Sequence, residues 1–328
     1  MKKKIAIVTG GDSGENAISL RSARNIDKYI DKEKFITFVI TINGNKWTYQ
    51  SSSETEILVD KNDFSIIENG EKIKFDCVFI AIHGTPGEDG KLQGYFDIMK
   101  IPYTSCDRTT SALTFNKFFC NQLVKGFGNV NVSKSIILRK GNKIDTEAIL
   151  NEIALPCFVK PNEGGSSLGV SKVKEKKDLI TAVENAFAVD EAVLIENFVK
   201  GREITCGIIK TGKNIKTLPV TEIISKNEFF DFDAKYDKFK ADEITPANIP
   251  QHISDECQKV SKELYILLNC KGIVRFDYIL TPDEKLFFLE VNSIPGLTDE
   301  SIVPKQALAA GISNTKLFTL LLEETLGI

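Results

Sequence analysis

The sequence is poor in several features that mark common classes of protein. It holds only two histidines, His83 and His252, which excludes a zinc site built from several histidines. Its seven cysteines are scattered without a CxxC pair and mostly lie in or beside apolar runs, as buried thiols of a reducing compartment do. No uncharged run approaches the roughly 18 residues that a membrane-spanning helix needs. The net charge of −3 provides no overall basic field for nucleic acid.

The 328 residues otherwise have the composition of an ordinary globular protein, with 42% hydrophobic and 27% charged side chains. That length exceeds what one hydrophobic core usually organises and fits two or three units. No repeat, low-complexity tract or long flexible linker divides the chain. We expect a cytoplasmic protein with no nucleic-acid or membrane partner, made of three parts that share an interface: residues 1–105, 106–199 and 200–328.

The first part alternates β-branched runs with a segment of helical period. Residues 5–8, 35–42 and 77–82 predict strands, and residues 17–30 place apolar side chains near helical spacing. Strand–helix alternation of this kind predicts a parallel sheet with helices on its faces. The expected fold class is therefore α/β (α+β), beginning with a parallel-sheet domain.

The rest of the chain predicts a small sheet and then a larger antiparallel one. A helical segment begins at Ser111, two short strands flank a glycine–serine loop, and AVLIENFV forms a further strand. Four later segments predict the antiparallel sheet: REITCGIIK, IKTLPVTEII, GIVRFDYIL and KLFFLEV. A polar and aromatic loop at 225–248, which we expect to be mobile, interrupts that sheet. The final segments PKQALAAGI and KLFTLLLEETL predict helices.

The last two of these strands carry the strongest chemical pattern. Because side chains alternate along a strand, Arg275 and Asp277 share one face, and Glu290 and Asn292 share a face of the next strand. A hairpin turning at 282–284 would set Asp277 opposite Glu290, and Arg275 would then face Asn292. The other faces are apolar: Val274, Phe276 and Tyr278 in the first strand, and Phe287, Leu289 and Val291 in the second.

Two directly opposed carboxylates repel each other unless a cation lies between them. Carboxylates and an amide oxygen are ligands that Mg²⁺ prefers. The hairpin therefore predicts a magnesium site at Asp277, Glu290 and Asn292. The alternative is an exposed polar face on which Arg275 neutralises both acids.

A second pattern is the glycine–serine loop in KPNEGGSSLGVSKV, residues 160–173. Glycines expose backbone N–H groups to phosphate oxygens, and the serine hydroxyls add donors. Lys160, at the end of the preceding strand, could meet a phosphate as a point charge. The lysine precedes the loop, so the segment is not a P-loop. A merely flexible hairpin is the alternative.

A third pattern lies near the N-terminus, where TGGDSGENAISLRSA places glycines between the first strand and a helix. The carboxyl ends of parallel strands are where such sheets bind small ligands. Glu15 near the helix start could serve a ligand or simply complement the helix dipole. His83, which ends another strand, could be catalytic or structural.

In chain order these segments resemble the D-alanine–D-alanine ligase family of ATP-grasp enzymes. The similarity is carried by GGDSGENAISLRSA, HGTPGEDGKLQGYFDIMKIPYT, VKPNEGGSSLGVSKV, IENFVKGREIT, FFDFDAKY, RFDYIL and LEVNSIPGLTDESIVPK. The patterns HGxxGEDGxxQG and ExNxxPGxTxxS are long enough to be specific. The resemblance implies a two-part ATP-grasp fold after the N-terminal domain, and a homodimer.

The resemblance also implies roles for individual residues. Those that would contact ATP are Lys117, Lys160, Ser166, Ser167, Glu196 and Glu203. Those that would hold two Mg²⁺ or Mn²⁺ ions are Asp277, Glu290 and Asn292. Those that would bind the two D-alanines are Glu15, His83, Lys235, Gly296 and Ser301. Those with catalytic roles are Glu15, Ser166, Arg275 and Tyr236, the last of which would close over the site by bonding with Glu15 and Ser166.

The implied reaction is ADP-forming ligation of two D-alanines for peptidoglycan precursors, through an acyl phosphate that a mobile loop protects from water. An ATP-grasp ligase with another second substrate, such as D-lactate, D-serine or an L-amino acid, is the nearest alternative. A non-catalytic ATP-binding protein is a second alternative, which the retained magnesium triad and arginine argue against.

Overall fold

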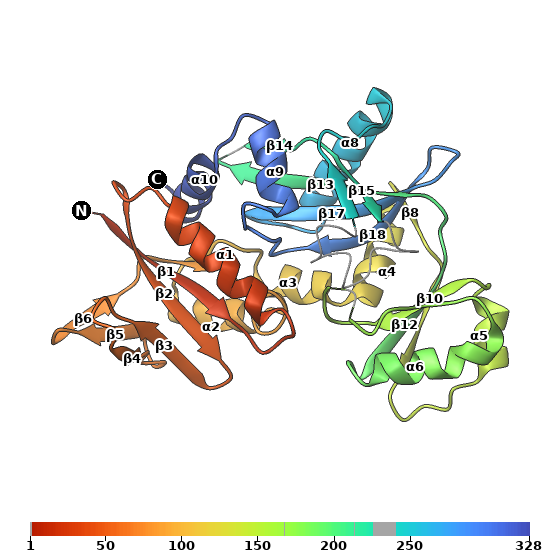
Figure 1. The fold of residues 1–328 in the computed structure, drawn as a ribbon, viewed down its shortest axis with the longest axis horizontal. Coiled ribbons are helices and arrows are strands. Elements are labelled where there is room, and N and C mark those ends of the chain that lie inside the picture. Colours follow the sequence, from red (N-terminus) through yellow and green to blue (C-terminus); the bar gives the residue numbers. More distant parts are fainter. Residues whose placement is uncertain (1, 167, 213, 226–240) are drawn as a thin grey trace.

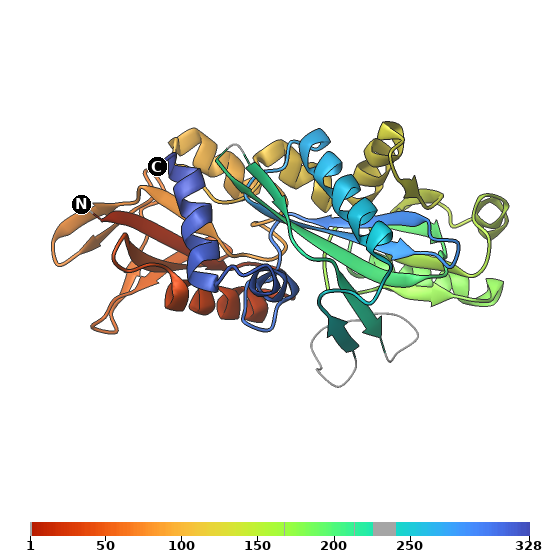
Figure 2. The same ribbon diagram turned by 90° about the horizontal axis from the view of Figure 1, so that it is seen from above.

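The computed structural model describes residues 2–166, 168–212, 214–225 and 241–328. Within these residues, three sheets of four or more strands lie in succession across the molecule, with helices packed against them (Figures 1 and 2). The α/β (α+β) fold class predicted from the sequence is confirmed.

The N-terminal sheet has the order β4-β3-β2-β1-β7. Its strands are β1 (Lys3–Gly10), β2 (Phe35–Asn43), β3 (Lys46–Gln50), β4 (Glu56–Leu58) and β7 (Cys77–Ile80). Strand β1 pairs in parallel with both β2 and β7, as the alternation of strands and helix predicts. The short strands β3 and β4 are antiparallel and were not predicted, because their mixed polar sequences lack a β-branched run.

Two helices and a ribbon complete this region. They are α1 (Asn16–Tyr29), α2 (Lys91–Met99) and the two-stranded ribbon of β5 (Ser65–Glu68) and β6 (Glu71–Lys74). Helix α1 packs over β1 and buries Ala23 and Ile26 in the same core as Ile5 and Ile7. Alternate residues of β1, such as Ala6, point into a second core on the other face of the sheet.

The central sheet has the order β11-β10-β12-β9, with every pair antiparallel. Its strands are β9 (Ser135–Arg139), β10 (Cys157–Pro161), β11 (Ser171–Val173) and β12 (Ala192–Asn197). The helical elements before and beside it are α3 (Arg108–Phe115), α4 (Lys117–Phe127), α5 (Thr146–Glu152), the 3₁₀ turn η1 (Lys176–Asp178) and α6 (Leu179–Phe187). The single helical segment predicted from Ser111 is two helices. Asn116 divides them, because its side chain caps α4 through the Phe119 N–H at 3.1 Å.

The C-terminal sheet has the order β16-β15-β13-β17-β18-β8, with β14 also on β13. Its strands are β8 (Asn131–Val132), β13 (Arg202–Thr211), β14 (Asn214–Thr217), β15 (Thr221–Ser225), β16 (Ala241–Ile244), β17 (Ile273–Leu280) and β18 (Leu286–Asn292). The predicted antiparallel sheet is confirmed. The single strand predicted at IKTLPVTEII is wrong, since β14 and β15 pair separately with β13. Pro219 lies between them and has no N–H for a continuous ladder.

Among the described elements, α3 and α4 contact strand β18 of this sheet, and α8 (Gln251–Leu267), α9 (Ile302–Ala309) and α10 (Asn314–Leu326) also pack on it. Helices α9 and α10 confirm the two helices predicted at the end of the sequence. Helix α10 also reaches the N-terminal sheet, where Phe318 meets Phe79 edge-on with ring centres 5.9 Å apart. Figures 1 and 2 both show α10 beside α1. One core is therefore built from the two ends of the described chain.

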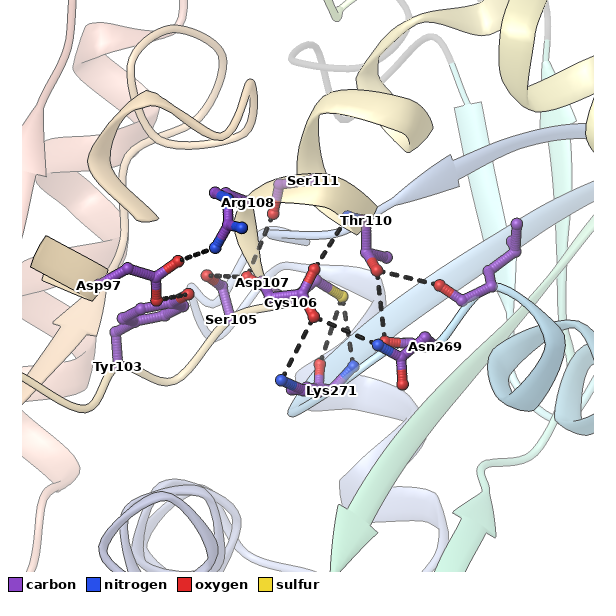
Figure 3. Close-up of polar contacts among 11 residues, drawn as sticks. Asp97, Tyr103, Ser105, Cys106, Asp107, Arg108, Thr110, Ser111, Asn269 and Lys271 are labelled. Atoms are coloured by element: carbon purple, nitrogen blue, oxygen red, sulfur yellow. Dashed lines mark hydrogen bonds and ion pairs between the residues drawn. The ribbon is translucent and has the colours of Figure 1, made fainter. Parts of the chain in front are cut away.

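A polar network ties the N-terminal region to the C-terminal sheet (Figure 3). Asp97 accepts hydrogen bonds from Tyr103 at 2.9 Å and from Arg108 at 2.8 Å. Asp107 caps α3 through the Thr110 N–H at 3.0 Å and pairs with Lys271 at 3.3 Å. The segment between the two regions is thereby fixed to both.

The seven cysteines are free and buried, as predicted. None of the described helices combines the length and apolar character needed to cross a membrane.

Candidate active site

A cavity of about 850 Å³ opens between the N-terminal region, the glycine–serine loop, strand β18 and the start of helix α9. Many residues that the sequence marks as site residues line it together: Glu15, His83, Lys117, Ser166, Arg275, Glu290, Asn292, Gly296 and Ser301. Segments far apart in the sequence therefore meet at one place.

The hairpin register at the cavity is the predicted one. In the pairing of β17 with β18, Asp277 lies opposite Glu290 and Arg275 lies opposite Asn292. The cross-strand placement inferred from side-chain alternation is confirmed.

Asp277 is only 2% exposed and is held by several polar groups. Arg275 donates to both of its carboxylate oxygens at 2.8 Å, in a bidentate ion pair. Thr205 donates at 2.5 Å and Asn292 at 2.9 Å. Burial disfavours a charged guanidinium, but the adjacent Asp277 charge overrides this and raises the pKa of Arg275. The predicted alternative is thus partly right, since Arg275 neutralises Asp277, but Asp277 is buried rather than exposed.

Glu290 lies at the cavity wall and is less buried than Asp277. The Lys117 ammonium is 3.9 Å from its carboxylate and donates to the Gly164 carbonyl at 2.5 Å. Lys117 therefore connects the glycine–serine loop to the hairpin, at a position where a phosphate between the two would meet its charge.

The predicted apolar face of β18 is wrong for Phe287 and Leu289, which precede Glu290 in the strand. A β-bulge falls between the pairs of Asp277 and Tyr278, so that Tyr278 lies opposite Phe288. Phe288 joins Val291 in the buried core, in place of Phe287 and Leu289. The extra residue reverses the alternation, which a strict period of two does not anticipate.

Glu15 immediately precedes helix α1 and faces the glycine–serine loop. The Ser166 hydroxyl donates a short hydrogen bond to its Oε1. A side chain at Gly165 would place its Cβ 2.5 Å from Glu15 Oε2, so any other residue would displace the Glu15 carboxylate. The N-terminal region and the loop are therefore in direct contact across the cavity.

His83 is 6% exposed and is held as a neutral ring. Its Nδ1 lies 3.0 Å from the Ile294 carbonyl, so this nitrogen carries the proton. Its Nε2 then accepts from the Ser22 hydroxyl at 3.2 Å. Burial lowers the pKa of His83, against the opposing effect of Glu15.

The sequence reasoning missed Glu88, a cavity residue within the GEDG segment. Its Oε2 accepts from the Gly84 N–H at 2.8 Å, and the Ile294 N–H stabilises the same carboxylate more weakly. Burial raises the pKa of Glu88 to about 8, and the charge of Glu15 adds to the rise. An acidic residue between glycines after a buried strand was the available signal.

Gly296 and Ser301 lie close together at the start of helix α9. A Cβ on Gly296 would lie 2.7 Å from the Ser301 hydroxyl. That hydroxyl accepts from the Thr298 N–H at 3.1 Å and lines the cavity.

Three predicted ATP residues lie away from the cavity lining. Lys160 and Glu196 form an ion pair at 2.7 Å within the central sheet, and both are almost fully buried. Glu203 lies on β13 opposite Ile279 of β17. Neither the pair nor Glu203 is among the described residues that line the cavity. Ser167, Lys235 and Tyr236, also predicted to act here, lie outside the described residues.

The hairpin offers suitable oxygen ligands for a hard cation. Within the described part of the chain, no group of three His, Cys, Asp or Glu side chains could hold a metal ion. The predicted set differs in having two carboxylates and one amide, on cross-strand neighbours. The Asn292 nitrogen donates to Asp277, which leaves its carbonyl oxygen as the acceptor that it can offer. Oxygens of this kind suit Mg²⁺.

Comparison with known proteins matches nearly the whole chain. A family model described as "D-ala D-ala ligase N-terminus" matches residues 4–106, and one described as "D-ala D-ala ligase C-terminus" matches residues 123–323. The D-alanine--D-alanine ligase of Phocaeicola vulgatus is 49% identical over 98% of this chain and 99% of its own. That of Flavobacterium johnsoniae is 47% identical over 99% of each chain.

Solved structures are similar over the same length. The VanG D-Ala:D-Ser ligase from Enterococcus faecalis superposes with a TM-score of 0.88 at 31% identity, covering 99% of this chain and all of that one (100%). The D-alanine--D-alanine ligase of Bacillus anthracis, in complex with ATP, gives a TM-score of 0.78 at 28% identity, covering 99% of this chain and 97% of that one.

Proposed function

The chain belongs to the D-alanine–D-alanine ligase family, and from this premise we propose that it uses ATP to join two D-alanines into D-alanyl-D-alanine. The product would serve peptidoglycan precursor synthesis in the cytoplasm. The observation that carries the proposal is the meeting of Glu15, the Ser166 loop and the Arg275–Asn292 hairpin around one cavity.

The reaction has two steps, and both suit this cavity. A carboxylate is a poor electrophile, so the first D-alanine is phosphorylated by ATP to an acyl phosphate, with release of ADP. The amine of the second D-alanine then attacks the carbonyl carbon, and the tetrahedral intermediate expels phosphate. The protein contributes orientation, charge stabilisation and exclusion of water.

Named residues divide this work. Glu15 would hold the first ammonium, helped by His83, whose neutral ring adds no competing charge. Arg275 and the backbone at Gly296 would stabilise the oxyanion. Ser301 would bind the carboxylate of the second D-alanine.

ATP would lie between the central and C-terminal sheets. Lys117 and Lys160 would meet its phosphates, beneath the loop of Ser166 and Ser167. Glu196 and Glu203 would meet adenine and ribose. Because Lys160 and Glu196 bind each other in the structure, nucleotide binding would have to rearrange or extend this pair.

Asp277, Glu290 and Asn292 would hold two Mg²⁺ or Mn²⁺ ions. Bound divalent cations neutralise phosphate charge during transfer. Lys235 would help to bind the second D-alanine, and Tyr236 would complete the closure with Glu15 and Ser166. We also infer a homodimer, which sedimentation analysis can test.

D-Serine is a second candidate for the acceptor amino acid. A D-Ala:D-Ser ligase is among the similar structures, at 31% identity. D-Serine differs from D-alanine by one hydroxyl group, so small differences in the acceptor wall decide between them.

The test is phosphate release and product analysis with ATP and Mg²⁺, first with D-alanine alone and then with D-alanine plus each of D-serine, L-alanine and D-lactate. We expect phosphate and dipeptide in equal amounts with D-alanine alone. Phosphate release that depends on D-serine or D-lactate as acceptor would favour the alternatives. The absence of any product would contradict the ligase assignment.

A further inference from the structure

Gln306, on helix α9, is a fully buried polar side chain with no role in the reaction described above; its exposed fraction is 0%. Its amide nitrogen donates to the Thr205 carbonyl and to the Thr221 hydroxyl, each at 3.0 Å. Its amide oxygen accepts from the Gly207 N–H at 3.0 Å. Both amide donors and the acceptor are therefore used, by groups on two different strands.

The position of these bonds in the sheet explains why a glutamine is needed. Strand β15 pairs with β13 only up to Thr205, and β14 pairs with it from Ile208 onward. The Gln306 amide bonds to β13 across the gap between these two pairings, as a peptide group would. An apolar side chain would leave the Gly207 N–H buried without this partner, which destabilises this part of the sheet.

Gly207 provides the space for this contact. A Cβ at this position would lie 2.5 Å from Gln306 Oε1 and 3.0 Å from Leu218 Cδ1. Real Cβ atoms do not approach so closely, so any other residue would displace the Gln306 amide. The glycine and the glutamine therefore form one matched pair.

Strands β15 and β16 pair as an antiparallel ribbon, and helix α9 is linked to β16 as well as to β15. Thr221 on β15 lies 2.6 Å, hydroxyl to hydroxyl, from Thr245, just after β16. Lys305, next to Gln306, forms an ion pair with Glu243 of β16 at 3.0 Å. Consecutive residues of one helix thus contact both strands of the β15–β16 ribbon.

This ribbon and the start of α9 form one wall of the cavity. Asp242 and Glu243 come from β16, whereas Ser301, Ile302 and Lys305 come from the start of α9 and its first turns. The apolar contacts of α9, such as Val303, hold it to the sheet without fixing its direction. The Gln306 hydrogen bonds are directional, so they set the position of Ser301 relative to the ribbon.

We propose that Gln306 is a positioning residue that fixes the wall formed by α9 and the β15–β16 ribbon, and thereby sets the choice between D-alanine and D-serine as acceptor. This inference rests on the proposed ligase function and on Ser301 as the acceptor subsite. A wall that is loosened by about one methyl or hydroxyl group admits the larger amino acid. ATP and the first D-alanine bind at other parts of the site and remain unaffected.

The test is competition between equimolar D-alanine and D-serine, with dipeptides identified by mass and their C-terminal residue by fragmentation. We expect Gln306→Met to shift the ratio of D-alanyl-D-serine to D-alanyl-D-alanine about tenfold toward serine, while the KM for ATP stays within about twofold. Gly207→Ala and Gln306→Ala should each shift the ratio in the same direction. The double variant Gly207→Ala/Gln306→Ala should shift it little further than either single variant, because the two residues act as one unit.

Gln258→Met is the matched control. Gln258 lies on α8 and donates to the Leu218 carbonyl at 2.9 Å, outside the cavity wall. Its substitution should leave the product ratio unchanged. An equal shift in this control, or an unchanged ratio in folded Gln306→Met, would overturn the proposal.

A second pair of variants decides the matter if Gln306→Met does not fold. Thr221→Val removes the hydroxyl without changing the shape, and Thr221→Ser retains it. Only the valine variant should shift the ratio, and equal ratios in the two would also overturn the proposal. If the wild-type protein makes no dipeptide, the ligase function has failed, whereas a wild type that makes dipeptide without these shifts refutes only the role of Gln306.

Discussion

Two buried carboxyl groups lie near the cavity in different electrostatic settings, Asp277 on strand β17 and Glu88 in the loop after β7. Asp277 is 2% exposed and binds the Arg275 guanidinium through both oxygens. Glu88 is 9% exposed, and the donors that bind it are backbone N–H groups, including that of Gly84 at 2.8 Å. Burial raises the pKa of Glu88 to about 8. A buried carboxyl can thus be stabilised by ion pairing or by keeping its proton, and its partners decide which occurs.

The largest effect on activity should come from Glu290, the member of the ion-paired cluster at the cavity wall. We predict that Glu290→Gln lowers turnover by roughly 10²–10³-fold, because it removes charge from the proposed metal site. Unfolding in urea should be unchanged. The measurement is phosphate release at saturating Mg²⁺.

Glu284→Gln, at the exposed turn of the same hairpin, is the matched control. It should retain full activity. Near-normal turnover of Glu290→Gln would contradict the metal-site assignment.

Removal of the Arg275 guanidinium should show what its ion pair with Asp277 contributes to stability. Arg275→Met leaves Asp277 buried without its guanidinium, and we expect a loss of about 3–5 kcal/mol in the free energy of unfolding at pH 7. Adding Asp277→Asn should recover part of this loss, since no charge then remains buried. Denaturation of the single and double variants by urea measures both. Equal losses in the two would show that packing, not charge, is responsible.

The pH dependence of stability should identify the acid that keeps its proton. Folded Glu88 is protonated up to about pH 8, whereas an unfolded glutamate ionises near 4.5. The stability that its protonated form contributes is therefore fully present below pH 4.5 and is lost as the pH rises to about 8.

Glu88→Gln removes this titration. Between pH 5 and pH 9 the variant should gain about 2–4 kcal/mol in stability relative to wild type. Urea denaturation at several pH values measures the difference. A constant difference across this range would show that Glu88 does not titrate as proposed.

The smallest effect should come from a neutral contact in the same region. Ser22→Ala removes the hydroxyl that donates to His83 Nε2. We expect a loss of about 1 kcal/mol in the free energy of unfolding. Ser53→Ala, in an exposed loop, should cost less than about 0.5 kcal/mol. A comparable loss in both variants would remove the distinction between the buried and the exposed hydroxyl.

The cluster of Arg275, Asp277, Glu290 and Asn292 was predictable because it depends on two strands that are neighbours in the sequence. Alternation together with a hairpin turn at 282–284 places Asp277 opposite Glu290, and the structure has that register. Alternation fails at the bulge, where Phe288 replaces its neighbours in the core, because no local signal marks the extra residue.

The uncharged pair of His83 and Glu88 depends on contacts between segments that lie far apart in the sequence. His83 and Glu88 both meet the backbone of Ile294, and burial there sets their pKa values. No periodicity in the sequence reports that contact. Gln306 was missed for the same reason, since its partners lie on strands far earlier in the chain. The family resemblance implied roles for the site residues, but it did not indicate the contacts made by Glu88 and Gln306.

The packing of helix α10 on the N-terminal sheet has a consequence for biosynthesis. Phe318 and Leu322 share a core with Ile7 and Phe79. During translation, Ile7 and Phe79 leave the ribosome long before the two residues of α10. Part of one face of that sheet therefore stays uncovered until translation of the helix is complete. An exposed apolar surface of this kind attracts chaperones and other nascent chains. The N-terminal region should consequently reach its protease-resistant state only after α10 has emerged from the ribosome, although its own sequence is translated first.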